Sequence, residues 1–123
     1  MKILMPKLVF PIRATICDFC SSKDVLWSYE CPDFETPLPN EEPWVSTGGW
    51  AACQTCHDFI EADDWSGLIA HAVRMFFVHR PEVPNIPQFR NHIDGRLRII
   101  YAKFAELKTE CIPADEYVRR HYP

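Results

Sequence analysis

The chain has 123 residues, of which 47% are hydrophobic and 13% aromatic, and its formal net charge is −4. This composition excludes a disordered chain and predicts one domain that buries roughly 65% of the surface exposed by its unfolded form. The charge is uneven: residues 1–73 hold four Lys or Arg and eleven Asp or Glu, whereas residues 74–123 hold nine and six. The acidic first part is a poor surface for phosphate, so nucleic acid is expected, if anywhere, on the C-terminal part.

Residues 1–16 predict an extended arm or edge strand. Pro6 and Pro11 disfavour a helix there, and prolines protect an exposed edge from pairing with another chain. Pro6 and Lys7 also interrupt what would be the apolar part of a signal peptide. No run approaches the ~18 apolar residues that span a bilayer. The sequence therefore predicts no membrane contact and a reducing, cytoplasmic location.

Two C-x-x-C pairs form the strongest motif, Cys17 with Cys20 and Cys53 with Cys56. Each pair turns tightly enough for both thiolates to face one ion, and two such pairs indicate a tetrahedral four-cysteine site. Four soft thiolates match zinc and leave no open coordination position for catalysis. The sequence therefore predicts one structural zinc ion bound by these four cysteines. The spacer of 32 residues predicts an inserted element between the pairs.

The spacer itself predicts a small antiparallel hairpin and a loop. Residues 25–29 and 44–46 favour strands, and residues 31–43 contain four prolines and four acids, which indicates a loop. A helix that begins near Cys53 would place both thiols of the second pair on one face and would favour thiolate through its exposed N–H groups. The order of knuckle, hairpin and helix is the treble-clef arrangement.

Two longer amphipathic helices are predicted next. Asp63 or Asp64 can cap the first, whose apolar stripe comprises Trp65, Leu68, Ile69, Ala72, Val73, Phe76 and Phe77. Prolines between residues 81 and 87 predict a stiff linker. The second helix is predicted over residues 88–110, with a near-heptad seam of Phe89, Ile93, Leu97, Ile100, Phe104, Leu107 and Cys111. A short helical turn is expected over residues 115–122.

These elements predict an α+β fold. A small four-cysteine zinc-ribbon or treble-clef module with an antiparallel hairpin packs against two or three helices. The module with its N-terminal arm and following helix takes residues 1–80. The Pro-rich linker and C-terminal amphipathic helix, residues 81–123, pack on the module, so that the whole chain is one domain.

Other interpretations of the cysteines remain open. A C-x-x-C at a helix start is also the thioredoxin-type redox arrangement, although bound zinc would quench both pairs. The run from Cys53 to His57 spells the c-type haem attachment pattern, which requires export and leaves the first pair unexplained. His57 is more simply a surface residue or a hydrogen-bond partner of a thiolate. Cys31 has no assigned role, and Cys111 is expected to be a small core residue of the helix seam.

The sequence shows none of the common catalytic motifs. We find no Ser/His/Asp order with a local signature, no Gly-rich phosphate loop, and no His/Glu pair at helical spacing suited to catalytic zinc. The sequence therefore predicts a non-enzymatic protein.

The stretch that begins with CDFCSS at Cys17 and continues through GGWAACQTCHDFIEADDW resembles small uncharacterised bacterial zinc-ribbon and treble-clef proteins. The resemblance covers about residues 14–70. It implies zinc on Cys17, Cys20, Cys53 and Cys56 and no settled activity. GATA-type and LIM-type fingers are similar only in the plan of two C-x-x-C pairs, and their spacer is shorter.

The predicted function is a zinc-stabilised adaptor or regulator that binds another protein. Its expected surfaces are the acidic loop 31–43 and the helix 88–110, through which a homodimer is also expected. The alternative is a nucleic-acid-binding regulator that uses Arg90, Arg96, Arg98 and Lys103. A second alternative is a C-x-x-C thiol-disulfide redox protein.

Overall fold

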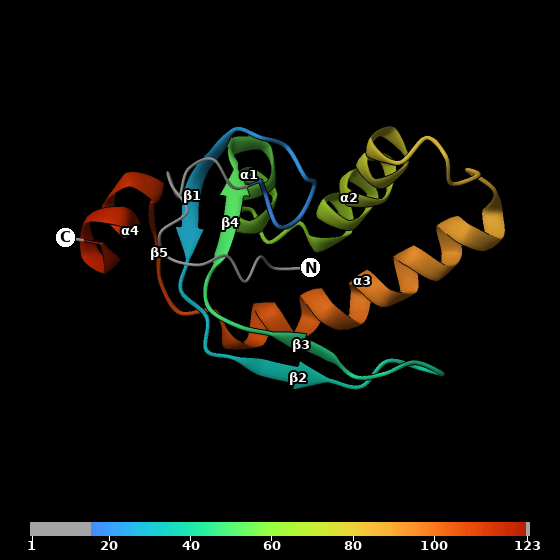
Figure 1. Ribbon diagram of the computed structural model, residues 1–123, viewed down its shortest axis with the longest axis horizontal. Coiled ribbons are helices and arrows are strands. Elements are labelled where there is room, and N and C mark those ends of the chain that lie inside the picture. The colour runs from blue at the N-terminus through green and yellow to red at the C-terminus, as the bar shows by residue number, and fades with distance from the viewer. Residues whose placement is uncertain (1–15, 123) are drawn as a thin grey trace.

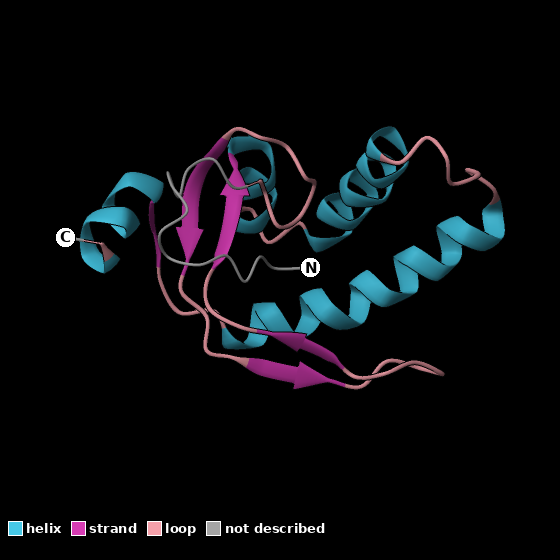
Figure 2. Cartoon of the chain, viewed as in Figure 1, coloured by secondary structure: helices cyan, strands magenta, loops and turns pink. Residues whose placement is uncertain are grey.

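The computed structural model describes residues 16–122, so the predicted arm lies outside the described residues except for Ile16. The described part of the chain is α+β, with four helices and two small antiparallel sheets (Figures 1 and 2). This confirms the predicted fold class. The strands pair antiparallel and the helices lie beside the sheets, whereas in an α/β fold helices would alternate with parallel strands.

The larger sheet has the strand order β4, β1, β5, and both pairings are antiparallel. The central strand β1 (Val25–Tyr29) pairs with β4 (Trp50–Cys53), with Tyr29 opposite Trp50. The third strand, β5 (Cys111–Pro113), places Cys111 opposite Tyr29 on the other side of β1. The end of the chain therefore lies directly beside the cysteine module.

The second sheet is a hairpin inserted between the cysteine pairs. It consists of β2 (Phe34–Thr36) and β3 (Trp44–Ser46) in antiparallel pairing. Phe34 and Thr36 are buried and Glu35 is exposed, which is the alternation of a half-buried strand. The expectation that residues 31–43 are all loop was therefore wrong, because β2 occupies part of them. The strand predicted over 44–46 is β3, and it pairs with β2 while β1 pairs with β4.

Four helices complete the described chain: α1 (Gln54–Glu61), α2 (Trp65–His79), α3 (Pro87–Leu107) and α4 (Ala114–His121). Asp64 caps α2, since its carboxylate accepts a hydrogen bond from the Gly67 N–H at 2.9 Å. The cap was one of the two predicted candidates.

The predicted extension of α3 to residue 110 was wrong. The helix ends at Leu107, and Lys108 is already extended. The Thr109 N–H donates to the Glu30 carbonyl at 2.9 Å, and the Glu30 N–H donates to the Glu110 carbonyl at 2.7 Å. These pairings with the chain beyond β1 replace further helical hydrogen bonds. Cys111 consequently belongs to β5 and not to the helix seam.

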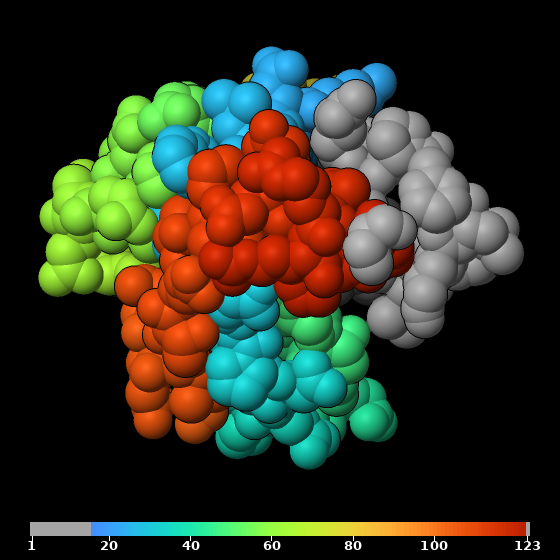
Figure 3. All heavy atoms as spheres, turned by 90° about the vertical axis from the view of Figure 1, so that its left-hand side faces the viewer, coloured from blue at the N-terminus to red at the C-terminus, as the bar shows by residue number. Residues whose placement is uncertain are grey.

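The core is an aromatic cluster beneath the sheets. Trp50 is 2% exposed, and its ring lies 4.8 Å from Phe104 of α3 and 5.1 Å from Phe19 of the first cysteine pair. Phe104 is fully buried, and Tyr101 packs edge-on against Phe19. The second half of α3 thus packs against the cysteine module. On the face shown in Figure 3, α4 lies at the centre, next to the end of α3, and it contacts β1.

Candidate metal centre

The two cysteine pairs meet at one buried point. Their four sulfur atoms lie within 4.8 Å of one another, and Cys20 Sγ is 3.6 Å from Cys53 Sγ. All four side chains are buried, at no more than 5% exposure. The structure therefore brings together all four cysteines that the spacing singled out: Cys17, Cys20, Cys53 and Cys56.

The first pair sits on a tight turn. The Cys17 N–H donates to the Ser22 carbonyl at 2.7 Å, and the Phe19 N–H points at the Cys17 sulfur at 3.4 Å. Ser21 has a φ of +69°, which closes the turn. Asp18 fastens the turn to β4, because its carboxylate accepts the Ala51 N–H at 2.7 Å. The backbone and not the metal alone therefore positions these two thiols.

The second pair joins β4 to α1. Cys53 ends the strand and occupies the N-cap position of α1, and Cys56 lies in its first turn. The side chain of Cys53 makes no cap hydrogen bond. Its sulfur therefore points at the cluster, close to the unpaired N–H groups at the start of the helix, and these favour thiolate.

The four cysteine thiols strongly change one another's pKa values. Hydrogen bonding from Cys17 raises the pKa of Cys56, and hydrogen bonding with Cys20 raises the pKa of Cys17. Hydrogen bonding with Cys17 lowers the pKa of Cys20, and it lowers the pKa of Cys53 to about 6. Four cysteine thiols buried in one place cannot all lose their protons unless a nearby cation compensates the negative charge. A divalent metal ion would supply that positive charge.

A zinc ion fits this donor set. In a tetrahedral site with Zn–S bonds of about 2.3 Å, neighbouring sulfurs are about 3.8 Å apart. The separation of 3.6 Å between Cys20 Sγ and Cys53 Sγ is close to that value. No disulfide joins the described cysteines. The cluster could therefore hold a metal ion, and all four positions of a tetrahedral ion would then be filled by sulfur.

A second group of ligand-type side chains lies nearby and was missed. His57, Glu61 and Cys111 present a ring nitrogen, a carboxylate oxygen and a sulfur within 4.8 Å of one another. His57 and Glu61 are four residues apart on α1, a spacing that places both side chains on one face of the helix. The spacing was visible in the sequence. The position of Cys111 beside them could not be inferred from the sequence, because only the pairing of β5 with β1 brings it close to His57 and Glu61.

Tyr29 is the buried partner of this second group. Its hydroxyl donates to Glu61 Oε2 at 2.7 Å and lies 2.9 Å from His57 Nδ1. Burial raises the pKa of Tyr29, so the phenol remains protonated and available as a donor. The indole ring of Trp27 stacks on the His57 imidazole at 4.0 Å. His57 is thus fixed in orientation and is not the simple surface residue that the sequence suggested.

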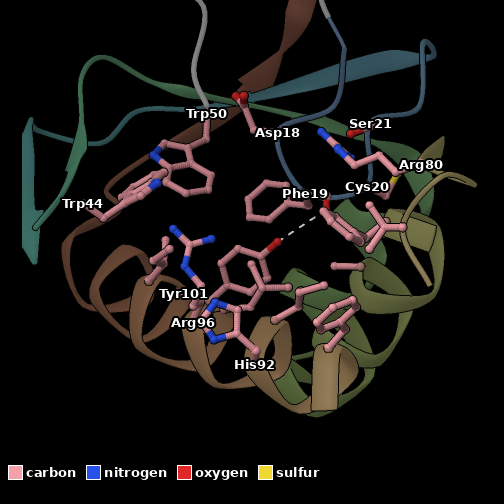
Figure 4. Close-up of a pocket in the computed structure, with 17 residues that line it drawn as sticks. Asp18, Phe19, Cys20, Ser21, Trp44, Trp50, Arg80, His92, Arg96 and Tyr101 are labelled. Carbon is pink, nitrogen blue, oxygen red and sulfur yellow. Dashed lines mark hydrogen bonds between the residues drawn. The ribbon is translucent and has the colours of Figure 1, made fainter. Parts of the chain in front are cut away.

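A pocket of about 450 Å³ opens between α2, α3 and the first cysteine turn (Figure 4). Its walls are aromatic and aliphatic, with Phe19, Trp44, Trp50, Phe76, Phe89 and Tyr101 among the lining residues. Arg80, His92 and Arg96 also line it, and Asp18 is its acidic member. The Arg80 guanidinium lies over the Phe76 ring at 4.7 Å. The pocket therefore combines an apolar wall with a cationic border.

Each of the four basic residues considered for nucleic acid has a charged or polar partner within the chain. Arg96 pairs with Glu41 at 3.2 Å, Arg98 with Asp94 at 2.6 Å, and Lys103 with Glu106 at 3.7 Å. Arg90 donates to the Asn85 side chain at 2.8 Å. By helical periodicity Arg96 and Lys103 share one face of α3, and Arg90 and Arg98 share another. The structure places all four of these residues on α3.

The acidic segment 31–43 lies against α3. Glu41 contacts both Arg96 and His92, the latter at 3.7 Å. Cys31 is buried outside both ligand groups. Two expected interaction surfaces, the acidic segment and α3, thus meet at the border of the pocket.

Comparison with known proteins gave no relatives: no family model, curated protein or solved structure matches the chain. Among the described residues, no helix is long and apolar enough to cross a membrane.

Proposed function

We propose that the protein is a non-enzymatic adaptor in which one structural zinc ion supports a binding pocket for another protein. The module has the knuckle, strand pair and helix order of a treble clef, with the two halves of the metal site at either end of that order. A closed four-sulfur site provides stability and no open coordination position. Burial of all four thiols also disfavours redox exchange, which requires an accessible thiolate.

The main support for an adaptor role is the pocket between α2 and α3. Its volume of about 450 Å³ is large enough for an apolar side chain together with its neighbours. The lining aromatic rings are typical of the centre of a binding interface. Among the described residues Arg80 forms no ion pair with a carboxylate, whereas Arg96 and His92 share Glu41. The occupant that suits this border is an apolar residue flanked by acidic residues.

The structural zinc and the pocket are connected through shared residues. Phe19 and Cys20 line the pocket and belong to the first cysteine turn. Loss of the metal would therefore disturb one wall of the pocket. The ion acts on binding through the fold and not by contact with the partner.

The test uses short synthetic peptides with a central Leu, Phe or Trp flanked by either glutamates or lysines. We expect the glutamate series to bind and the lysine series not to bind, as measured by fluorescence anisotropy. Arg80→Glu should weaken binding by about tenfold or more, the effect of losing one desolvated charge pair. Arg74→Glu is the matched control, since Arg74 is exposed on α2, which ends just before Arg80, and does not line the pocket. Equal binding of both series, or equal effects of both substitutions, would refute the proposal.

A further inference from the structure

The group formed by His57, Glu61 and Cys111 is a candidate ligand site separate from the four cysteines. It draws on two distant parts of the chain, α1 and β5. We propose that this group is a second zinc site, in which His57 Nδ1, the Glu61 carboxylate and Cys111 Sγ bind one zinc ion. It is independent of the proposed adaptor function.

The distances suit such an ion. His57 Nδ1 lies 3.7 Å from Cys111 Sγ. Two ligands of a tetrahedral zinc ion, one nitrogen and one sulfur, are about 3.6 Å apart when the bond lengths are about 2.0 and 2.3 Å. All three ligand atoms fall within 4.8 Å of one another. Only small side-chain adjustments are needed for all three to reach one ion.

The ligands are already oriented by their neighbours. Trp27 and the His57 ring stack with an interplanar angle of 9°, which restricts rotation of the imidazole. Tyr29 is 1% exposed and holds Glu61 Oε2 from the buried side. Outer groups of this kind fix metal ligands in known sites. When zinc binds Nδ1, the imidazole carries its proton on Nε2 and Cys111 releases its thiol proton to solvent. His57 then gives up its hydrogen bond to Tyr29, while the Tyr29–Glu61 bond remains.

The mixture of donors specifies the metal class. One imidazole, one carboxylate and one thiolate together match zinc, whereas calcium and magnesium require oxygen ligands only. Glu61 is exposed and His57 is half-buried, so an ion can enter from solvent. Three protein ligands leave a fourth position for water or for a donor atom of a bound molecule. This site therefore differs in kind from the closed four-cysteine cluster.

Zinc at this site would link β5, which leads into α4, to α1 of the cysteine module. Cys111 lies on β5, directly before α4, whereas His57 and Glu61 lie on α1, next to the second cysteine pair. An ion bound by all three adds a link between these elements beyond the β1–β5 hydrogen bonds. We therefore expect slower hydrogen exchange in residues 111–121 when the second zinc is bound.

The experiment is a zinc titration of the full chain, followed by native mass spectrometry and calorimetry. The variants are Glu61→Gln, which keeps an acceptor for Tyr29, and Cys111→Ser. The control is Asp58→Asn, an exposed residue on the same helix and outside the group. Circular dichroism confirms that each variant is folded, and Glu61→Gln serves as the test if Cys111→Ser does not fold.

We expect the natural chain and Asp58→Asn to bind two zinc ions. Glu61→Gln and Cys111→Ser should keep the first ion and bind the second at least about tenfold more weakly, since even loss of an outer partner costs that much. With cobalt, the second ion should add a thiolate charge-transfer band that Cys111→Ser lacks. The proposal is overturned if the chain binds no second zinc in excess metal, or if both variants bind it as tightly as the control.

Discussion

Trp50 shows how a single residue connects the parts of this molecule. Its ring contacts Phe19 of the cysteine turn and Phe104 of α3, and its N–H donates to Ser46 Oγ at 3.1 Å. The sequence places Trp50 three residues before a cysteine pair. It does not reveal Phe104 as its neighbour, because that contact crosses more than fifty residues of chain.

Replacement of Trp50 by Ala should lower the free energy of unfolding by about 3–5 kcal/mol. The large buried ring would leave a cavity that the surrounding aromatic residues cannot fill. Urea denaturation followed by circular dichroism measures the change. Leu26→Ala is the control, because Leu26 is 53% exposed and its loss should change stability by no more than about 0.5 kcal/mol. Equal losses for the two variants would contradict this view of the core.

The elements of the fold depend on both local signals and distant contacts. The start of α2 is local: Asp64 caps the helix, and a Cβ at Gly67 would lie 2.5 Å from the Asp64 carboxylate. The end of α3 is set by a distant part of the chain, since the backbone of Glu30 forms hydrogen bonds with the residues just beyond Leu107. This difference explains why the cap was predicted and the helix end was misplaced.

Replacement of Asp64 by Ala should destabilise the protein by about 1 kcal/mol, the usual value of a side-chain cap. The physical reason is that the Gly67 N–H loses its acceptor. Thermal unfolding of Asp64→Ala beside Asp64→Asn measures it, because asparagine retains an acceptor oxygen in the same place. A loss as large for Asn as for Ala would show that charge and not the cap is responsible.

At the scale of the whole molecule, the four-cysteine site joins the chain on either side of the inserted hairpin. Removal of zinc by a chelator should therefore unfold the module, since binding energy of structural zinc is folding energy. Acid should have the same effect, because protonation of the thiolates releases the metal and stability then falls as the pH falls.

Cys53→Ser should abolish retention of the tightly bound zinc, as measured by native mass spectrometry, and should unfold the module. Cys31→Ser is the matched control, since Cys31 is equally buried but lies outside the cluster. If Cys53→Ser kept both its fold and its tightly bound zinc, the assignment of the four cysteines as ligands would be wrong.

The sequence by itself determined the features that depend on short spacing. C-x-x-C places two thiols on one turn, and the periodic stripe of α2 places its apolar residues on one face. It also contained the four-residue spacing of His57 and Glu61. These are properties of a few consecutive residues, and backbone geometry alone fixes which way the side chains point.

Only the tertiary structure decided which distant elements meet. The pairing of β5 with β1 brings Cys111 to His57, and the packing of α3 on the cysteine turn forms the pocket wall. Strand pairing and helix packing across long separations depend on the burial of the whole core and on which backbone groups still need partners. No spacing within a short segment records those choices.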